Sequence, residues 1–123
     1  MAAKSTYLSD AMLDAVLKDT AYTSPTTVYL ALFDGDPATT GTEVSGGSYA
    51  RQSAAFNTAA SGSTTNSAAI SFTGMPAATV NYCAIYDALT AGNLLYYASV
   101  TSLTINAGDT VSVAVGAITV TES

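Results

Sequence analysis

The sequence contains no histidine and no tryptophan, and its only cysteine is Cys83. Without an imidazole it cannot build a Ser-His-Asp or Cys-His arrangement for nucleophilic catalysis. A four-ligand zinc site would lack both imidazoles and a set of thiolates, and a single cysteine excludes an intrachain disulfide. We therefore expect that the protein is not an enzyme, binds no metal or organic cofactor and has no small-molecule substrate. One catalytic alternative stays open, acid–base chemistry by paired carboxylates among Asp34, Asp36, Glu43, Asp87 and Asp109.

Basic residues are also scarce, because three Lys and Arg stand against nine Asp and Glu and give a net charge of −6. Lys4, Lys18 and Arg51 are scattered, whereas nucleic-acid affinity comes largely from clustered Lys and Arg that neutralise phosphates. The chain has no apolar run near the roughly 20 residues that span a bilayer. Its N-terminal segment also lacks the continuous apolar stretch of a secretory signal. We expect no nucleic-acid partner, no membrane partner, and synthesis in the cytoplasm.

What remains is a chain that is 49% hydrophobic and only 10% charged over 123 residues. Its polar share consists mainly of Ser, Thr and Asn, which are compatible with pleated sheets and with close contact between subunits. A chain of this length has room for one hydrophobic core. We therefore expect a single domain over residues 1–123.

One helix is predicted at about residues 6–19, because apolar side chains recur there at helical spacing. A serine or threonine can cap its start, Asp10 favours the positive end of the helix dipole, and Lys18 lies near the opposite end. The apolar residues lie on one side, so this helix must pack against something. They are Leu8, Met12, Leu13, Val16 and Leu17, and the candidate caps are Ser5, Thr6 and Ser9.

After the helix, short segments rich in Val, Ile, Thr, Tyr and Phe alternate with turn residues, which is typical of strands. The clearest hairpin passes through residues 89–93, where Gly92 and Asn93 can supply positive φ. Six or seven antiparallel strands with one N-terminal helix predict a mainly β fold, a β-sandwich or jelly roll over about residues 26–121. The expected strands are residues 26–33, 49–56, 68–72, 79–88, 93–100, 101–106 and 109–123, the last bent at Gly116 and Ala117.

Two stretches fit no element, residues 34–48 and 57–69, and connections of this length are usually functional or ordered by a partner. The acids in "DGDPATTGTE" resemble a calcium loop, but their spacing fails the calcium-hand pattern, so we favour a turn with solvated acids. Arg51 follows as the only arginine in the chain. A salt bridge to Glu43, Asp34 or Asp36 that pins the loop is favoured over a recognition role.

The eight tyrosines have two readings, since tyrosine packs within sheets and also marks contact surfaces. We favour strand packing for Tyr82, Tyr86 and Tyr96. Tyr96 and Tyr97 are adjacent, so their side chains must lie on opposite faces of the sheet. The residues that we predict at a protein interface are Asp36, Thr39, Thr40, Glu43, Val44, Tyr49, Arg51 and Tyr97.

Several motifs along nearly the whole chain resemble those of a family of small tailed-bacteriophage virion proteins. The most specific are "LALF" at residues 30–33 with Asp36-Pro37, the stretch from Glu43 to Arg51, and "IYDA" at 85–88 followed by "GNLLY" at 92–96. Members commonly carry the label phage tail fibre protein, and some resemble capsid cement or decoration proteins. The resemblance implies a structural protein assembled in the bacterial host cytoplasm.

Within this family we favour a cement protein on the outer capsid surface, because fibre shafts use repeats and this chain has none. Its expected partners are the major capsid protein and further copies of itself in a homotrimer. The alternative is a tail-fibre or tail-tip protein that binds a cell-surface receptor through exposed tyrosines and acids.

Overall fold

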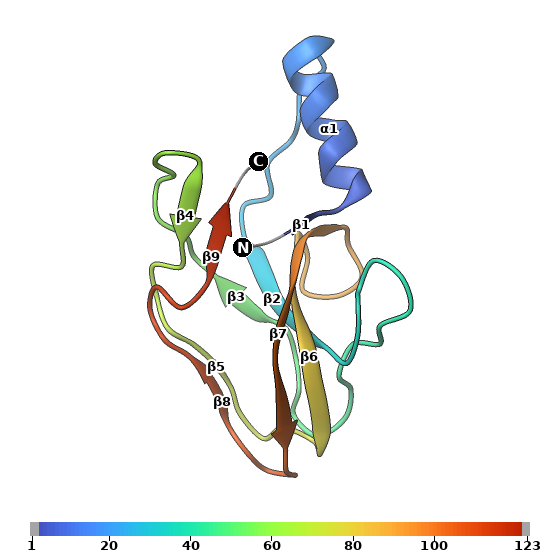
Figure 1. Ribbon diagram of the computed structural model, residues 1–123, viewed down its shortest axis with the longest axis vertical. Helices are drawn as coiled ribbons and strands as arrows, with labels where there is room; N and C mark the ends of the chain where they lie inside the picture. The colour runs from blue at the N-terminus through green and yellow to red at the C-terminus, as the bar shows by residue number, and fades with distance from the viewer. Residues whose placement is uncertain (1–2, 122–123) are drawn as a thin grey trace.

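The computed structural model describes residues 3–121 and is mainly β, with antiparallel strands and one N-terminal helix, which confirms the predicted fold class (Figure 1). The helix is α1 (Thr6–Leu17). The strands are β1 (Ala3–Lys4), β2 (Val28–Phe33), β3 (Gln52–Ala54), β4 (Ser63–Thr65), β5 (Ile70–Phe72), β6 (Ala78–Tyr86), β7 (Leu94–Ile105), β8 (Val111–Val113) and β9 (Thr119–Thr121).

The main layer is a five-stranded antiparallel sheet in the order β1-β7-β6-β2-β3. Its centre is the pairing of β6 with β2 and β7, in which Ala84 lies opposite both Ala31 and Tyr97. Side chains of β2 alternate, so Leu30 and Leu32 face the core while Ala31 and Phe33 face the other way.

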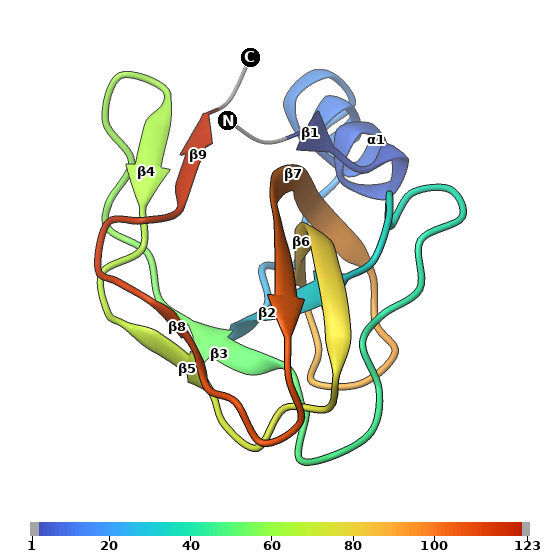
Figure 2. The ribbon, with the colours of Figure 1, turned by 60° about the horizontal axis from the view of Figure 1, so that its bottom comes forward.

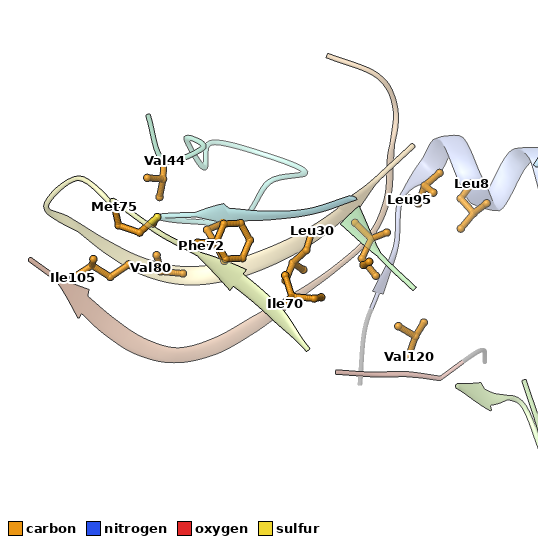
Figure 3. Close-up of a cluster of buried hydrophobic side chains, with 13 residues drawn as sticks. Leu8, Leu30, Val44, Ile70, Phe72, Met75, Val80, Leu95, Ile105 and Val120 are labelled. Atoms are coloured by element: carbon orange, nitrogen blue, oxygen red, sulfur yellow. The ribbon is translucent and has the colours of Figure 1, made fainter. Parts of the chain in front are cut away.

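Two short ribbons, β4–β9 and β5–β8, lie opposite the core face of this sheet (Figure 2). Between the layers Phe72, Leu30 and Met75 are 1% exposed, and Figure 3 shows them among the other buried apolar side chains. The core thus lies on one face of the five-stranded sheet, and the opposite face is left to a smaller cluster and to loops.

Helix α1 begins at the N-cap Ser5, whose side chain accepts a hydrogen bond from the Leu8 backbone N–H, as the sequence predicts. Ser5 also donates its hydroxyl to the Leu94 carbonyl, which ties the helix start to β7. Leu8 is the buried residue of the helix and lies next to Leu95 (Figure 3). The helix ends two residues earlier than predicted, and Asp10 lies beyond the first turn, so its expected role at the helix dipole is wrong. No helix in the described part of the chain has the length and hydropathy to cross a bilayer.

Several strand boundaries differ from the predicted ones. The expected loop 57–69 contains β4, and the segments 93–100 and 101–106 form the single strand β7. The hairpin turn at 89–93 is confirmed, but positive φ occurs at Ala91 and Gly92 rather than at Asn93.

The bend at Gly116 is confirmed and separates β8 from β9. Val115, next to this bend, is 62% exposed. Residues 122 and 123 of the predicted last strand, and residues 1 and 2 of the predicted domain, lie outside the described residues.

Candidate interaction surface

The outer face of the five-stranded sheet carries a second apolar cluster rich in tyrosine. Ala31 and Ala84 lie at its centre and are 0% and 1% exposed. They are covered because the buried Phe33 of β2 and larger, partly buried side chains of β6 and β7 pack around them. We call this surface the tyrosine face, and its residues are Phe33, Tyr82, Tyr86, Leu94 and Tyr97.

Tyr86 is held in place from two sides. Its ring stacks on Phe33 with centroids 6.1 Å apart and an interplanar angle of 8°. The Arg51 guanidinium lies over the same ring, 3.8 Å from its centroid, which is a cation–π contact. Burial raises the pKa of the Tyr86 phenol above its usual value.

Arg51 is 9% exposed and forms a bidentate pair with Glu43. Its Nε lies 2.9 Å from Glu43 Oε2 and its Nη2 lies 3.0 Å from Oε1. Its Nη1 donates to the Ala88 and Ala91 carbonyls at 3.0 and 2.8 Å. The predicted structural salt bridge is therefore confirmed with Glu43 as partner, and it joins loop 34–48 to the turn at 87–93.

Tyr49 extends this network into the core. Its hydroxyl donates to Glu43 Oε2 at 2.7 Å and accepts the Leu32 backbone N–H at 3.1 Å. Its ring stacks on Phe72 with centroids 5.9 Å apart. Burial and the hydrogen bond to Glu43 raise the pKa of the Tyr49 phenol well above its usual range, because both favour the protonated form.

The acids of "DGDP" hold the turn of loop 34–48. Asp34 Oδ1 accepts the Thr42 N–H at 2.7 Å, and Asp36 Oδ1 accepts the Ala38 N–H at 2.8 Å, so the turn interpretation is confirmed. A Cβ on Gly41 would lie 2.2 Å from the Gly35 carbonyl oxygen, so only glycine fits this close approach. Among the described residues, no three Asp, Glu or Cys side chains are grouped where they could hold a metal ion.

The structure places the predicted interface residues in four different environments. Glu43, Tyr49 and Arg51 come together in the internal network, and Val44 is 8% exposed and belongs to the core. Thr39 and Thr40 are exposed in the turn beside the half-buried Asp36. Tyr97 alone among them lies on the tyrosine face. A role for any of them at an interface stays a prediction.

Sequence reasoning missed how many aromatic residues share this outer face. Tyr82 and Tyr86 were assigned to strand packing, and both do pack, yet both stay partly exposed beside Tyr97. The alternation of side chains along β6 was the signal that could have grouped Tyr82 with Tyr86. Tyr96 packs toward the core, so the predicted opposite orientation of Tyr96 and Tyr97 is confirmed. Burial raises the pKa of the Cys83 thiol, as expected for an unreactive cysteine.

The raised pKa of Tyr49 predicts a loss of stability in alkali. The unfolded phenol releases its proton near pH 10, whereas the folded protein retains it, so the stabilisation is complete below about pH 10 and falls as the pH rises further. The contribution of Tyr49 should fall by up to about 1.4 kcal/mol per pH unit. Urea unfolding at pH 9 to 11 should show a shallower decline for Tyr49→Phe than for the unmutated protein. Tyr7→Phe, on the exposed part of α1, is the control, and equal slopes for all three proteins would contradict the assignment.

The chain was compared with models of known protein families. A family model described as "Podophage GP4 fiber I protein gp80" matches residues 3–121, almost the whole chain. A search of curated proteins found no significant match.

Proposed function

We propose, from the premise that this chain belongs to the podophage GP4 fiber I protein family, that it is a fibre-associated protein of the virion that contacts the host cell. The family match makes it a bacteriophage structural protein. The proposal goes further in assigning it to the fibre and in giving the tyrosine face the contact with a cell-surface receptor. The observation that supports this proposal most strongly is the family match over residues 3–121.

The family description supports the tail-fibre alternative better than the capsid cement role that the sequence analysis favoured. A fibre shaft needs sequence repeats, whereas a compact domain attached to the shaft does not. The absence of repeats in this chain is therefore compatible with a place in the fibre outside the shaft. The Arg51–Glu43 pair, in which the Arg51 side chain is 8% and the Glu43 side chain 27% exposed, fixes the loop beside the outer sheet face, as a rigid binding surface requires.

Binding rather than catalysis is the proposed mode of action. The tyrosine face consists of aromatic and aliphatic side chains, and tyrosine offers a large rigid contact area with a hydroxyl at its edge. Such residues carry much of the energy at interfaces, and their two χ angles lose little entropy when bound. A sheet face of this kind fits the ring faces of a surface glycan.

Competition with phage adsorption tests this function. Purified protein should reduce adsorption of the phage to its host, and Tyr97→Ala should weaken this competition by about tenfold or more, since it removes an aromatic contact residue. Tyr7→Ala is the matched control, because Tyr7 is an exposed tyrosine on α1 that does not belong to the tyrosine face. Both variants must retain the native circular dichroism spectrum.

Two results would contradict the receptor role. One is an absence of competition at saturating protein, and the other is an equal effect of Tyr97→Ala and Tyr7→Ala. A gain in heat resistance of capsids after addition of the protein would instead support the cement role.

A further inference from the structure

In the described part of the chain, the outer edge of β7 has no neighbouring strand along most of its length. β1 pairs with β7 at Tyr96 and Tyr97, and beyond Tyr97 the strand pairs with β6 alone. Residues 99–104 are all exposed, although they belong to a regular strand. The backbone N–H and C=O groups that face away from β6 along this stretch are therefore open to a further strand.

This edge carries none of the residues that normally prevent strands from pairing. Proteins protect exposed edges with lysine or other charged side chains, and with proline. The sequence of residues 98–105 is "ASVTSLTI", which contains no charged residue and no proline. Its valine, threonines and isoleucine favour extended structure. An unprotected edge of this composition indicates a strand that pairs with another chain.

An uncharged groove of about 490 Å³ lies along the same edge, and we call it the β7 groove. Residues 98–103 of β7 line one side, and residues 111–113 and 117–119 line the other. In Figure 2 these two sides diverge from the turn that joins β7 to β8. None of the sixteen residues that line the groove is Asp, Glu, Lys or Arg. Leu30 and Val80 of the hydrophobic core are among them, so the groove reaches down to the core.

We propose that an extended segment of another protein chain pairs with the open edge of β7 and fills the β7 groove with alternate apolar side chains. The edge and the groove together select this occupant. A row of free backbone groups is satisfied along its length by another extended backbone, because a helix uses its backbone groups internally. A strand directs every second side chain to the same face, so apolar residues can enter the groove while the backbone pairs with β7.

β1 is an example of this pairing within the chain itself. Its two residues, Ala3 and Lys4, lie antiparallel to β7, opposite Tyr97 and Tyr96. The open stretch of β7 begins at Ala98, directly after these pairs. A donated strand would therefore lie in line with β1 and continue an edge that already accepts a strand.

The charge of the protein indicates which chain can supply the segment. Each copy carries a net charge of −6, which opposes pairing between two copies. The groove is uncharged, so an acid on the inserted face would be buried without a partner. The segment that fits best has apolar residues at alternate positions, no acids, and basic residues at its ends. Its origin in another fibre protein rests on the proposed function, whereas the pairing itself does not.

A synthetic peptide of about nine residues, in which valine and threonine alternate between two terminal lysines, tests the proposal. Heteronuclear NMR of the isotope-labelled protein is the measurement, because it follows each backbone amide. The peptide should shift the amide resonances of residues 98–105. Hydrogen exchange of the amides at the open edge should slow by about tenfold or more, because they become hydrogen-bonded.

A second peptide, with proline in place of the central valine, is the control for backbone pairing. Proline has no N–H and does not pair in the middle of a sheet. This peptide should bind about tenfold more weakly or worse.

Leu103→Lys tests the site on the protein, because it places a charge in the β7 groove and protects the edge as lysine does elsewhere. It should weaken binding of the valine–threonine peptide about tenfold or more. Leu89→Lys is the matched control, since Leu89 is 49% exposed, lies in the turn at 87–93 and receives the same charge. It should bind the peptide like the unmutated protein. Val100→Lys takes the place of Leu103→Lys if that variant loses the native circular dichroism spectrum.

Four results would overturn the strand pairing. The first is no shift at residues 98–105 at the highest peptide concentration, and the second is equal binding of the proline peptide. The third is binding without slower exchange at residues 98–105, as a compact apolar ligand in the groove would give. The fourth is self-association of the protein alone that Leu103→Lys abolishes, which would assign the edge to a second copy. None of them bears on phage adsorption, so the pairing can fail while the receptor role stands, and the reverse.

Discussion

Replacing Asn66 with alanine is expected to lower the free energy of unfolding by about 3 kcal/mol. Asn66 is 0% exposed and its side chain makes three hydrogen bonds to backbone groups. Its Nδ2 donates to the Ala68 and Ala114 carbonyls, both at 3.0 Å, and its Oδ1 accepts the Ile118 N–H at 2.9 Å. Alanine would leave these groups without partners, and each buried polar group that loses its partner costs about 1–3 kcal/mol.

The location of Asn66 explains why its replacement should lower the stability so strongly. It lies between β4 and β5, and its bonds reach the turn that joins β8 to β9. Its backbone N–H donates to the Ile118 carbonyl, and its backbone carbonyl accepts a hydrogen bond from the Gly116 N–H. Asn66 therefore fixes the segment between β4 and β5 against the turn between β8 and β9, where the two ribbons that cover the core meet.

Urea unfolding measures the effect, with Asn57→Ala as the control. Asn57 also bonds through its side chain, to Thr65, but it is exposed, so water can replace the partner that it loses. The control should lose less than about 1 kcal/mol. Equal losses in the two variants would show that Asn66 does not join the ribbons as described.

The second large effect is expected for Arg51→Ala, a loss of about 3 kcal/mol in the free energy of unfolding. The substitution leaves the Glu43 carboxylate, which accepts two bonds from Arg51, without its cation. It also removes the donor to the Ala88 and Ala91 carbonyls and the contact over the Tyr86 ring. Removal of one partner of a buried ion pair lowers the free energy of unfolding by more than an exposed ion pair contributes to it.

Lys18→Ala removes the same charge from an exposed position and should change the stability by no more than about 0.5 kcal/mol. Arg51→Lys should fall between the two, because lysine keeps the charge but cannot form the bidentate pair. Limited proteolysis should cut loop 34–48 faster in Arg51→Ala than in the unmutated protein. An Arg51→Ala protein as stable as Lys18→Ala would contradict the structural role of the pair.

Local patterns were sufficient to predict the elements that depend on neighbouring residues. The spacing of Leu8 and Met12 predicted α1, and the Val28–Phe33 segment follows strand composition. The turn at 89–93 was identified from its glycine, which adopts positive φ as expected. In each case the physical cause lies within a few residues of the position that it determines.

The elements that were missed depend on partners far along the chain. β4 forms because Thr64 lies opposite Val120, and β1 forms because Ala3 lies opposite Tyr97. Neither "STT" nor "AK" has a strong strand preference of its own, so pairing decides their conformation. The role of Asn66 was hidden for the same reason, since its side-chain partner Ile118 is 52 residues away.

The candidate surface was predicted in part. Arg51 was expected to pair with Glu43, Asp34 or Asp36, because a single arginine near several acids has few partners to choose from, and the structure shows Glu43 as the partner. The tyrosine face requires the register of β6 with β2 and β7, which brings Phe33 opposite Tyr82 and Ala84 opposite Tyr97. No local pattern determines that register.

The location of the chain in the virion tests the central proposal most directly. A reconstruction of the intact podophage by electron cryomicroscopy has density into which the five-stranded sheet and the projecting helix α1 can be fitted (Figure 1). We predict that this density lies in the fibres, with the tyrosine face turned away from the virion. Density for this fold on the outer capsid lattice, and none in the fibres, would contradict the proposal.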